Sequence, residues 1–537
     1  MNDAFARDLR VPVGCDPPFS FYSLIEDLYA RPSHQGREPN CRPIHRFCTL
    51  MRKLRAKSFI AEDLILNREL TDEKEMACKV CGEDATLRAR RLTFFRVPPE
   101  RLTWDKPAAA FEQHLLGYAI VVTLQLSKDH WRTYLLEAVV RPPSVVLMQE
   151  KGDTFMEPIT NYYVHNMRTY ETLIGTSGDH KRMSIRGSFF SQQNSLTSVC
   201  AHAALRMAVN SSPLLRVPKL TNRKINDILG VVDFRERGLS HEEIVAVLKD
   251  IECNWHTANF YQRTDIEYDH FLYPTLESGC PTILALENWD VKAGRRNQHV
   301  VAVLGHTLNS DRWWPEARTA YGSYPIREYI SSAEWCDHYI ISDDNFGMYL
   351  TLPTDSVRNF VVPSKNPAPH AVMAISIVPQ AAPMPGYVAE QLAAWQAYAL
   401  INSSAIESGP IWFRRLRDRP DMVCRTLLVT AEEYRESLRG LHTILSPAQQ
   451  SCLAGLPPYV WVTEISLPDV YQGNKHKLGE VVIRADASPQ EHVEGRSIAL
   501  AWLPGLALIG PQQRIEPWPV TMHVPLIRNS APSMLEW

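Results

Sequence analysis

The chain has 537 residues, of which 45% are hydrophobic and 22% are charged, and its formal net charge is -3. This length exceeds one ordinary hydrophobic core, so we expect roughly two to four domains. The composition is that of a globular protein, and 38 prolines predict many irregular connections. The slightly negative net charge excludes nucleic acid and anionic membranes as the main partners on electrostatic grounds.

The sequence predicts neither a secretory signal nor a membrane span. The first residues, MNDAFARDLR, lack a long apolar core. The most apolar stretch, residues 497–510, is interrupted by Pro504 and Gly505, whereas a membrane helix needs about 18 or more apolar residues. Eleven cysteines, an odd number without the spacing of a small disulfide scaffold, indicate reduced thiols. We therefore expect a cytoplasmic protein.

In chain order, the pattern predicts an α+β fold with four regions. Residues 1–110 form a mixed helical region with proline-rich connections, and residues 111–180 contain a β-hairpin at 117–147 around the polar turn SKDH. Residues 181–365 carry the candidate site discussed below. Residues 366–537 form a C-terminal α/β accessory region.

Three further elements are expected around and beyond the candidate site. Three prolines in VPSKNPAPH, residues 362–370, favour an irregular linker. A helix is expected at 387–402, and a second hairpin with a Gly-Asn turn at 459–487. We expect the regions on either side of the candidate site to select what binds there or to keep the site inactive until a trigger arrives, because they make up about two thirds of the chain.

The first candidate for chemistry is Cys200, in the stretch QQNSLTSVCAHAALRMAV. The residues before it are hydroxyl and amide side chains that compete with helix formation, and those after it are strong helix formers. Cys200 is therefore predicted in the first turn of a buried helix, where free amides and the macrodipole stabilise a thiolate. The alternative is a small buried hydrophobe, which is the usual role of a lone cysteine beside alanines.

A nucleophilic thiol needs a base, and His299 is the first candidate. Residues 276–307 have the pattern strand, polar loop, strand, and His299 directly precedes the apolar run VVAVLG. Two histidines compete for the role. His306 lies at the far end of the same strand, and His202 lies two residues after the thiol, so the helix turns it about 200° away.

The orienting acid and the oxyanion donor have more than one candidate each. The strand HYIIS ends in DDNFG, which offers Asp343, Asp344 or Asn345 to orient the imidazole. Two acids before an Asn-Phe-Gly turn are otherwise ordinary turn chemistry. Gln192 or Gln193, on the loop before the thiol, could donate an amide N–H to an oxyanion.

The order Gln, Cys, His, Asp resembles that of papain-like cysteine peptidases, in particular those that cleave double-glycine leaders from bacterial peptides. The stretch QNSLTSVCAHAAL is similar to the nucleophile motif of that group, with Gln193 and Cys200 in matching roles. It departs by one extra residue in the Gln–Cys interval and by Ala201 where glycine is usual. The Asp-Pro-x-x-Gly acid motif is replaced by DDNFG, whose register favours Asp343. The resemblance covers residues 185–362.

The segment between these motifs also resembles the family. Residues 224–251 predict two helices, the second with a capping box of Ser240 and Glu243. The stretch LESGCPTILAL is similar to the Gly-x-Pro-hydrophobic strand that precedes the histidine in the family.

The resemblance implies a papain-like domain whose catalytic helix packs on an antiparallel sheet, and covalent acyl transfer without a cofactor. Cys200 would attack the carbonyl, His299 would carry the proton, Asp343 would orient the imidazole, and Gln193 would donate to the oxyanion. The substrate would be a protein or peptide, cleaved at a peptide or isopeptide bond. The alternatives are an inactive papain-like binding protein and a transglutaminase or deamidase with the same triad.

A structural zinc site is a separate hypothesis. CRPIHRFC and CKVC place Cys41, His45, Cys48, Cys78 and Cys81 in one region, and Cys-x-x-Cys is a common half-site for zinc. The spacing of the first group matches no standard finger. The alternative is that these are free thiols in a helical subdomain.

Overall fold

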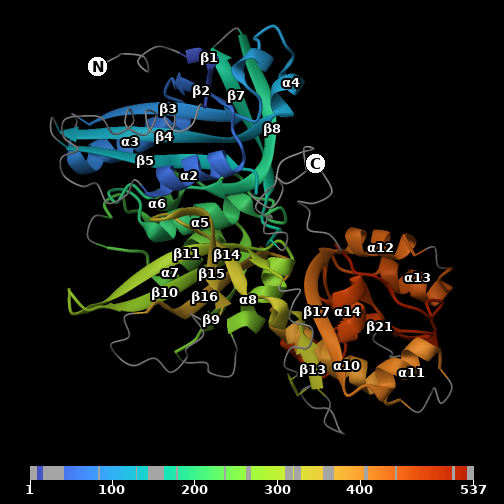
Figure 1. Cartoon of the computed structure of the whole chain (residues 1–537). Helices are drawn as coiled ribbons and strands as arrows, with labels where there is room; N and C mark the ends of the chain where they lie inside the picture. Colours follow the sequence, from blue (N-terminus) through green and yellow to red (C-terminus); the bar gives the residue numbers. More distant parts are fainter. Residues whose placement is uncertain are drawn as a thin grey trace.

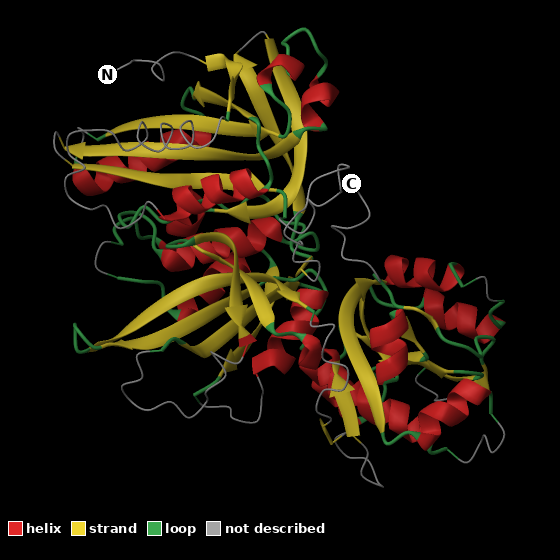
Figure 2. Cartoon of the chain, viewed as in Figure 1, coloured by secondary structure: helices red, strands yellow, loops and turns green. Residues whose placement is uncertain are grey.

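The computed structural model is a mixed α+β chain built around mostly antiparallel sheets (Figures 1 and 2). The described residues are 9–15, 42–82, 85–127, 130–142, 162–176, 179–234, 237–261, 268–308, 318–319, 328–354, 368–403, 409–441, 444–510 and 514–528. Among these, no helix combines the length and the apolar character needed to cross a membrane.

The N-terminal part forms a seven-stranded sheet. Its spatial order is β1 (Leu9–Gly14), β2 (Ser58–Asp63), β3 (Thr86–Phe95), β4 (Leu115–Ser127), β5 (His130–Val140), β8 (Asp179–Phe190) and β7 (Arg168–Thr176). The predicted hairpin at 117–147 is confirmed, since β4 and β5 pair in antiparallel register. The sheet crosses the domain boundaries expected at 110 and 180, because β3 pairs with β4 and β8 pairs with β5.

Two helices pack against this sheet, α2 (Arg42–Lys53) and α3 (Arg68–Cys81). In α2 the buried apolar side chains recur at the helical spacing i, i+3, i+4 and i+7, namely Ile44, Phe47, Cys48 and Met51. Most of the other positions of the helix carry polar side chains. One of them, Arg46, contacts the strand that follows the candidate acid, as described below.

The central sheet has the order β15 (Gly347–Pro353), β14 (His338–Asp343), β11 (Arg295–Thr307), β10 (Thr282–Asp290), β16 (His370–Pro379) and β9 (Cys253–Asn259), with β6 (Tyr162–Val164) beside β11. Helix α5 (Cys200–Ser211) lies between this sheet and the N-terminal sheet, packing on β11 and β8 (Figure 1). The predicted helices around 224–251 are α6 (Asn222–Leu229) and α7 (His241–Asp250), and the capping box is confirmed.

The central domain extends beyond the end expected at 365. Strand β16 pairs with both β10 and β9, so the sheet is complete only at residue 379. Most of the linker expected at 362–370 lies outside the described residues, and its last position already belongs to β16. Helix α8 (Tyr268–Glu277) covers the side of this sheet that leads to the C-terminal part.

The C-terminal part is an eight-stranded sheet. Its order is β12 (Arg318–Thr319), β13 (Glu328–Ser331), β17 (Asp421–Thr430), β18 (Tyr459–Ser466), β20 (Gly479–Arg484), β21 (Ile498–Leu503), β22 (Leu506–Ile509) and β23 (Arg514–Pro517). Strands β12 and β13 come from within the region expected to be central, and β13 pairs in parallel with β17. The helix expected at 387–402 is α10 (Gly386–Ile401).

The hairpin expected at 459–487 needs a correction. Strands β18 and β20 do pair in antiparallel register, but helix α14 (Pro468–Asn474) connects them in place of a Gly-Asn turn. Pro468 occupies the first helical position, where its missing N–H costs nothing. The Gly-Asn pair falls in the last turn of this helix, and Lys475 ends it in the left-handed region.

Candidate active site

The loop that leads to the candidate nucleophile is held by one asparagine. The Asn194 side-chain oxygen accepts three backbone N–H groups of the same loop, those of Leu196, Thr197 and Ser198. Its amide nitrogen donates to the buried Glu73 carboxylate of α3 at 3.2 Å. The N-terminal region thus supports the loop from which α5 starts.

Cys200 is the first residue of α5, as the sequence predicts. The Cys200 side chain is only partly buried, whereas the rest of the helix is buried. The Cys200 N–H has no hydrogen-bond partner among the described residues, so it can donate to a bound group. The interpretation of Cys200 as a buried hydrophobe is therefore not favoured.

His299 meets the thiol from β11. The first four residues of this strand are exposed, and burial begins at His299, whose side chain is 22% exposed. The imidazole interacts with the Cys200 side chain, and this interaction raises the pKa of His299. Its Nε2 lies 3.0 Å from Asp343 Oδ1 and 3.7 Å from Asp344 Oδ1.

The charge environment of His299 favours the imidazolium. Burial alone would lower the pKa of His299, but the hydrogen bonds with Asp343 and Cys200, and the charges of Asp343 and Asp344, raise it to about 11. An imidazolium beside a thiol favours the thiolate, which is the nucleophilic form.

The candidate acid Asp343 lies where β14 ends and the β14–β15 turn begins. Asp343 is the last residue of β14, and its Oδ1 accepts the Asn345 N–H at 2.8 Å, which fixes the carboxylate at the start of the turn. Asn345 Nδ2 lies 3.5 Å from His299 Nδ1, on the other side of the ring. Of the three predicted candidates, Asp343 makes the closest contact with Nε2 and is best placed to orient the ring.

Asp344 is a second carboxyl group that sequence reasoning left without a role of its own. Burial raises the pKa of Asp344 to about 7, although the positive charge of His299 and a hydrogen bond from Gln193 lower it. Two adjacent carboxylates beside one imidazole repel each other, and the wholly buried one is the easier to protonate. Asp344 therefore changes its charge near neutral pH while Asp343 stays paired with His299.

The structure separates the two glutamines. Gln192 is buried, and both its backbone and its side chain bond to Leu135 of β5. Gln193 is partly exposed and reaches the site, where its side chain contacts Asp344. The predicted oxyanion donor is thus in the site, where Asp344 is its neighbour.

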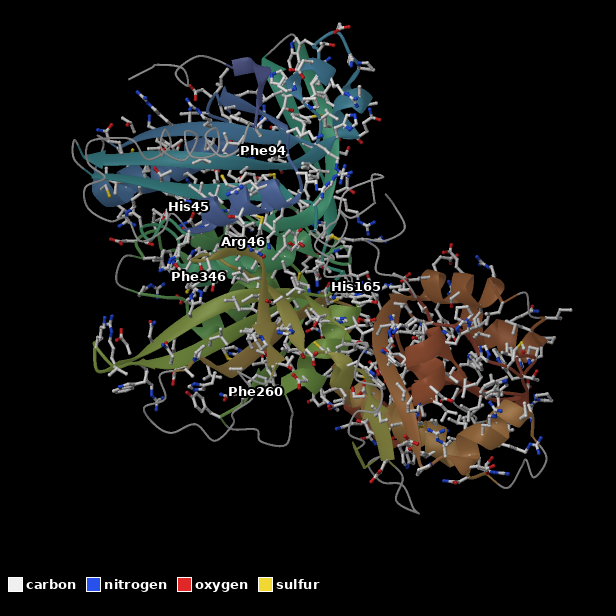
Figure 3. All side chains as sticks on the ribbon, in the orientation of Figure 1. His45, Arg46, Phe94, His165, Phe260 and Phe346 are labelled. Carbon is white, nitrogen blue, oxygen red and sulfur yellow. The ribbon has the colours of Figure 1, made fainter. Side chains whose placement is uncertain are left out.

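Arg46 of helix α2, in the N-terminal region, binds the start of β15, directly after the turn that follows Asp343. The sequence analysis did not predict this contact. The Arg46 guanidinium donates to the carbonyl oxygens of Met348 and Tyr349 at 3.0 and 2.6 Å. Gly347 has a φ of 116°, and a Cβ at this position would lie 2.5 Å from Arg46 Cγ. Figure 3 shows Arg46 and Phe346 at the junction of the N-terminal and central sheets. An isolated arginine on a predicted helix gives no sequence signal for such a long-range contact.

The two competing histidines have structural roles. His202 Nδ1 accepts the Val199 N–H at 3.4 Å and Nε2 lies 2.9 Å from Asn226 Oδ1, and burial lowers the pKa of His202 to about 4. His306 Nε2 lies 2.6 Å from Glu277 Oε2, in a buried cluster with Arg425. Neither faces Cys200.

The four described residues of the zinc hypothesis, His45, Cys48, Cys78 and Cys81, do not converge. Cys48 belongs to the apolar face of α2, and burial raises the pKa of its thiol to about 12. The Cys78 thiol donates to the Ala85 carbonyl, while Cys81 and His45 are exposed. Cys41, which the same hypothesis includes, lies outside the described residues.

Two other groups have the side chains of a metal site. Within the described part of the chain, potential ligand atoms lie within 4.8 Å of one another in His299–Asp343–Asp344 and in His165–Glu277–His306. In the second group Arg425 donates to the other oxygen of Glu277, which places a positive charge where a cation would bind. In the first group the grouping is accounted for by the ion pair of His299 with Asp343, at 3.0 Å.

Comparison with known proteins adds no family to this geometry. The chain matches no protein-family model and no curated protein sequence. The functional argument therefore depends on the convergence of Cys200, His299 and Asp343 in one partly exposed site.

Proposed function

We propose that the chain is a cysteine peptidase that hydrolyses a peptide or isopeptide bond of a protein substrate. The observation that carries this proposal is that the His299 ring contacts the Cys200 thiol and, through Nε2, lies 3.0 Å from Asp343. Nucleophile, base and orienting group within hydrogen-bond reach are the geometric signature of nucleophilic catalysis. The packing of α5 on an antiparallel sheet supports a papain-like central domain.

In the proposed reaction the Cys200 thiolate attacks the substrate carbonyl carbon, and the carbonyl π electrons move to oxygen. The Cys200 N–H at the start of α5 donates to this oxyanion. The tetrahedral intermediate collapses, the C–N bond breaks, and the His299 imidazolium gives its proton to the leaving amine. This leaves a thioester on Cys200 and a neutral imidazole.

In deacylation His299 accepts a proton, whereas in acylation it gives one. The neutral His299 removes a proton from water, whose oxygen attacks the thioester carbonyl. Collapse of the second tetrahedral intermediate breaks the C–S bond, releases the carboxylic acid and restores the thiolate–imidazolium pair. Throughout, the Asp343 carboxylate holds the ring orientation and stabilises its positive charge.

Gln193 is the second candidate donor to the oxyanion, and its availability depends on Asp344. In the resting site its amide contacts Asp344, whose pKa of about 7 leaves this carboxyl partly protonated at neutral pH. Protonation of Asp344 removes the negative charge that attracts the amide, so Gln193 becomes free to turn toward a substrate oxyanion. A Gln193→Ala variant is expected to lose about 100-fold or more in turnover if the amide serves as a donor.

The decisive experiment is product analysis by mass spectrometry. Full-length protein is incubated with a mixture of unfolded proteins, with and without a primary amine, and new termini and modified glutamines are counted. Hydrolysis predicts new N-termini, and their number should fall to background with Cys200→Ala. Amine incorporation or deamidation without new termini would instead indicate the transferase chemistry of the same thioester, and identical products from Cys200→Ala would refute the nucleophile.

A further inference from the structure

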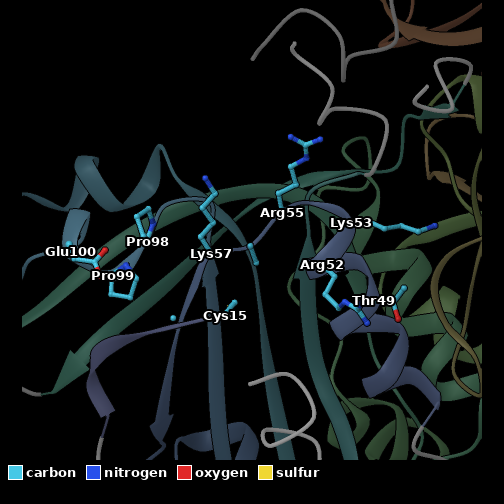
Figure 4. Close-up of a pocket in the computed structure, with 11 residues that line it drawn as sticks. Cys15, Thr49, Arg52, Lys53, Arg55, Lys57, Pro98, Pro99 and Glu100 are labelled. Atoms are coloured by element: carbon cyan, nitrogen blue, oxygen red, sulfur yellow. The ribbon is translucent and has the colours of Figure 1, made fainter. Parts of the chain in front are cut away.

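A second site lies in the N-terminal region. A cavity of about 980 Å³ opens where the end of α2 meets the start of β2 (Figure 4). Its polar lining consists of Thr49, Arg52, Lys53, Arg55, Lys57 and Glu100. This volume is in the range of small-molecule sites, which is roughly 300–1,000 Å³.

The charge of this cavity contrasts with that of the whole chain. Residues 52–57 contain four cationic side chains, and all four are exposed at the cavity, while Glu100 is the single acid in the lining. Arg52, Lys53 and Lys57 form no ion pair with another described residue. A concentration of positive charge in a hollow attracts anions far more strongly than scattered surface charges do.

Stabilisation of α2 explains only part of this charge. Arg52 and Lys53 lie in the last turn of the helix, where cations interact favourably with the negative end of the macrodipole. Arg55 and Lys57 lie beyond the helix, so this explanation does not extend to them. Both nevertheless point to the same cavity.

The backbone at Arg55 gives an independent indication. The bonds Arg55 N–H to Arg52 O and Ala56 N–H to Met51 O close the end of α2 with the pattern of a Schellman motif. In this motif the left-handed position is usually glycine, but here it is Arg55, with a φ of 58°. Strained non-glycine residues cluster at functional sites, and Lys475 at the end of α14 has the same conformation. Helix termination alone would be better served by glycine.

The cavity is also pre-organised and partly apolar. The Lys57 backbone accepts from Cys15 N–H and donates to Phe95 O, both at 2.9 Å, which ties the basic segment into the edge of the sheet. Pro98 and Pro99 line the cavity beside Glu100, with Lys57 between them and Arg55 (Figure 4). A ligand with an anionic part and an apolar part would match both walls.

The geometry points to a binding site for a soluble organic polyphosphate, of which a nucleoside triphosphate is the type, with phosphates against Arg52, Arg55 and Lys57 and the organic moiety against Pro98 and Pro99. Arginine forks match phosphate oxygens in pairs, and lysines add point charges. Several cations around one hollow require more than one phosphate to balance them. This site is separate from the Cys200 site and does not depend on the proposed peptidase activity.

Titration calorimetry on the full-length protein tests the assignment, with ATP and inositol hexakisphosphate as probes at physiological salt. We expect at least one of them to bind with a Kd of about 1–100 µM, and the tighter one identifies the organic moiety. Arg55→Gly should weaken binding by about tenfold or more while the thermal midpoint stays equal or rises, because glycine relieves the left-handed strain. Lys57→Ala should weaken binding similarly and serves as the second variant if Arg55→Gly lowers the midpoint.

Arg439→Ala is the matched control, since it removes one exposed cation at the end of α12 (Ala431–Arg439) in the C-terminal sheet. It should leave both affinities unchanged. The assignment is overturned if neither probe binds at about 1 mM, if Arg55→Gly and Lys57→Ala weaken binding no more than Arg439→Ala does, or if a short single-stranded oligonucleotide binds through the same residues more tightly than both probes.

Discussion

The N-terminal and C-terminal sheets both flank the central domain, but they meet it in different ways. The N-terminal region contacts the elements that carry the proposed catalytic side chains: Glu73 binds the loop before Cys200, and Arg46 binds the start of β15, after the turn that follows Asp343. The C-terminal sheet contacts the central domain through the buried network of Glu277 and Arg425, on the side of β11 that carries His306. The N-terminal region is thus in direct contact with the candidate site, and the C-terminal sheet packs on another side of the central domain.

This difference changes the expectation for the flanking regions. From length alone, both seemed to be accessory parts that select a substrate or regulate the enzyme. The contacts of Arg46 and Glu73 give the N-terminal region an architectural role at the site. The following variants test the contrast, from the largest expected effect to the smallest.

Arg425→Ala should destabilise the protein without altering the Cys200 site. It removes the guanidinium that pairs with both buried carboxylates, Glu277 and Glu464, and breaking a buried ion pair typically costs about 3–5 kcal/mol. Urea unfolding should show this loss, while the rate of Cys200 alkylation in the native baseline stays that of the wild type. A loss below 1 kcal/mol, of the size expected for the exposed Arg439→Ala, would mean that the network does not hold the two parts together.

Asp343→Asn should reduce turnover by about 100-fold or more, because the amide cannot stabilise the His299 imidazolium and can favour the wrong tautomer. The pH profile of turnover is the informative readout. With Asp343 gone, the pKa of His299 should fall, so that the activity lost at alkaline pH is lost at a lower pH than in the wild type. An unchanged profile would assign the orienting role to Asp344 or Asn345.

Arg46→Ala should lower turnover by about tenfold and stability by about 1–3 kcal/mol, since two hydrogen bonds from a charged donor to the β14–β15 turn are lost. His45→Ala is the control, because His45 is the exposed neighbour on the same helix. If both variants keep wild-type turnover, α2 does not position the acid. The N-terminal and C-terminal regions would then differ only in how they pack on the central domain.

Asp344→Asn should stabilise the protein at neutral and alkaline pH by about 1–3 kcal/mol. The pKa of Asp344 is raised to about 7, so the folded state binds more protons than the unfolded state between about pH 4 and pH 7, and the wild type loses stability as pH rises through that window. The amide has no charge to desolvate. The gain should therefore be present above pH 7 and absent below pH 4, as measured by urea unfolding at both pH values.

Local sequence patterns predicted the elements that carry the site. The change from hydroxyl and amide residues to alanines placed Cys200 at a helix start, and the apolar run after His299 placed this residue where β11 becomes buried. Both signals depend on neighbours in the chain. The clamp by Arg46, the choice between Gln192 and Gln193, and the domain boundaries depend on pairing between distant segments, such as β16 with β10, which no local pattern records.

The incorrect expectation of a Gly-Asn hairpin has a local cause. A Gly-Asn pair after an apolar run favours a turn, but Pro468 starts a helix before that pair is reached. The cysteines near residues 41–81 have a metal-like spacing in sequence, while helical periodicity turns Cys48 into the core and leaves Cys81 exposed. Spacing along a helix decides which side chains can meet, and here it separates them.

The central claim is that Cys200 is held as a thiolate by the His299 imidazolium, and the pH dependence of alkylation tests it most directly. Free cysteine provides the reference, because an unperturbed thiol ionises near about pH 8.5. Iodoacetamide should modify Cys200 at a nearly constant rate between pH 6 and pH 9, while the rate for free cysteine rises about tenfold per pH unit below about pH 8. In His299→Ala the Cys200 profile should become that of free cysteine. Parallel profiles of wild-type Cys200 and free cysteine would contradict the ion pair, and with it the peptidase.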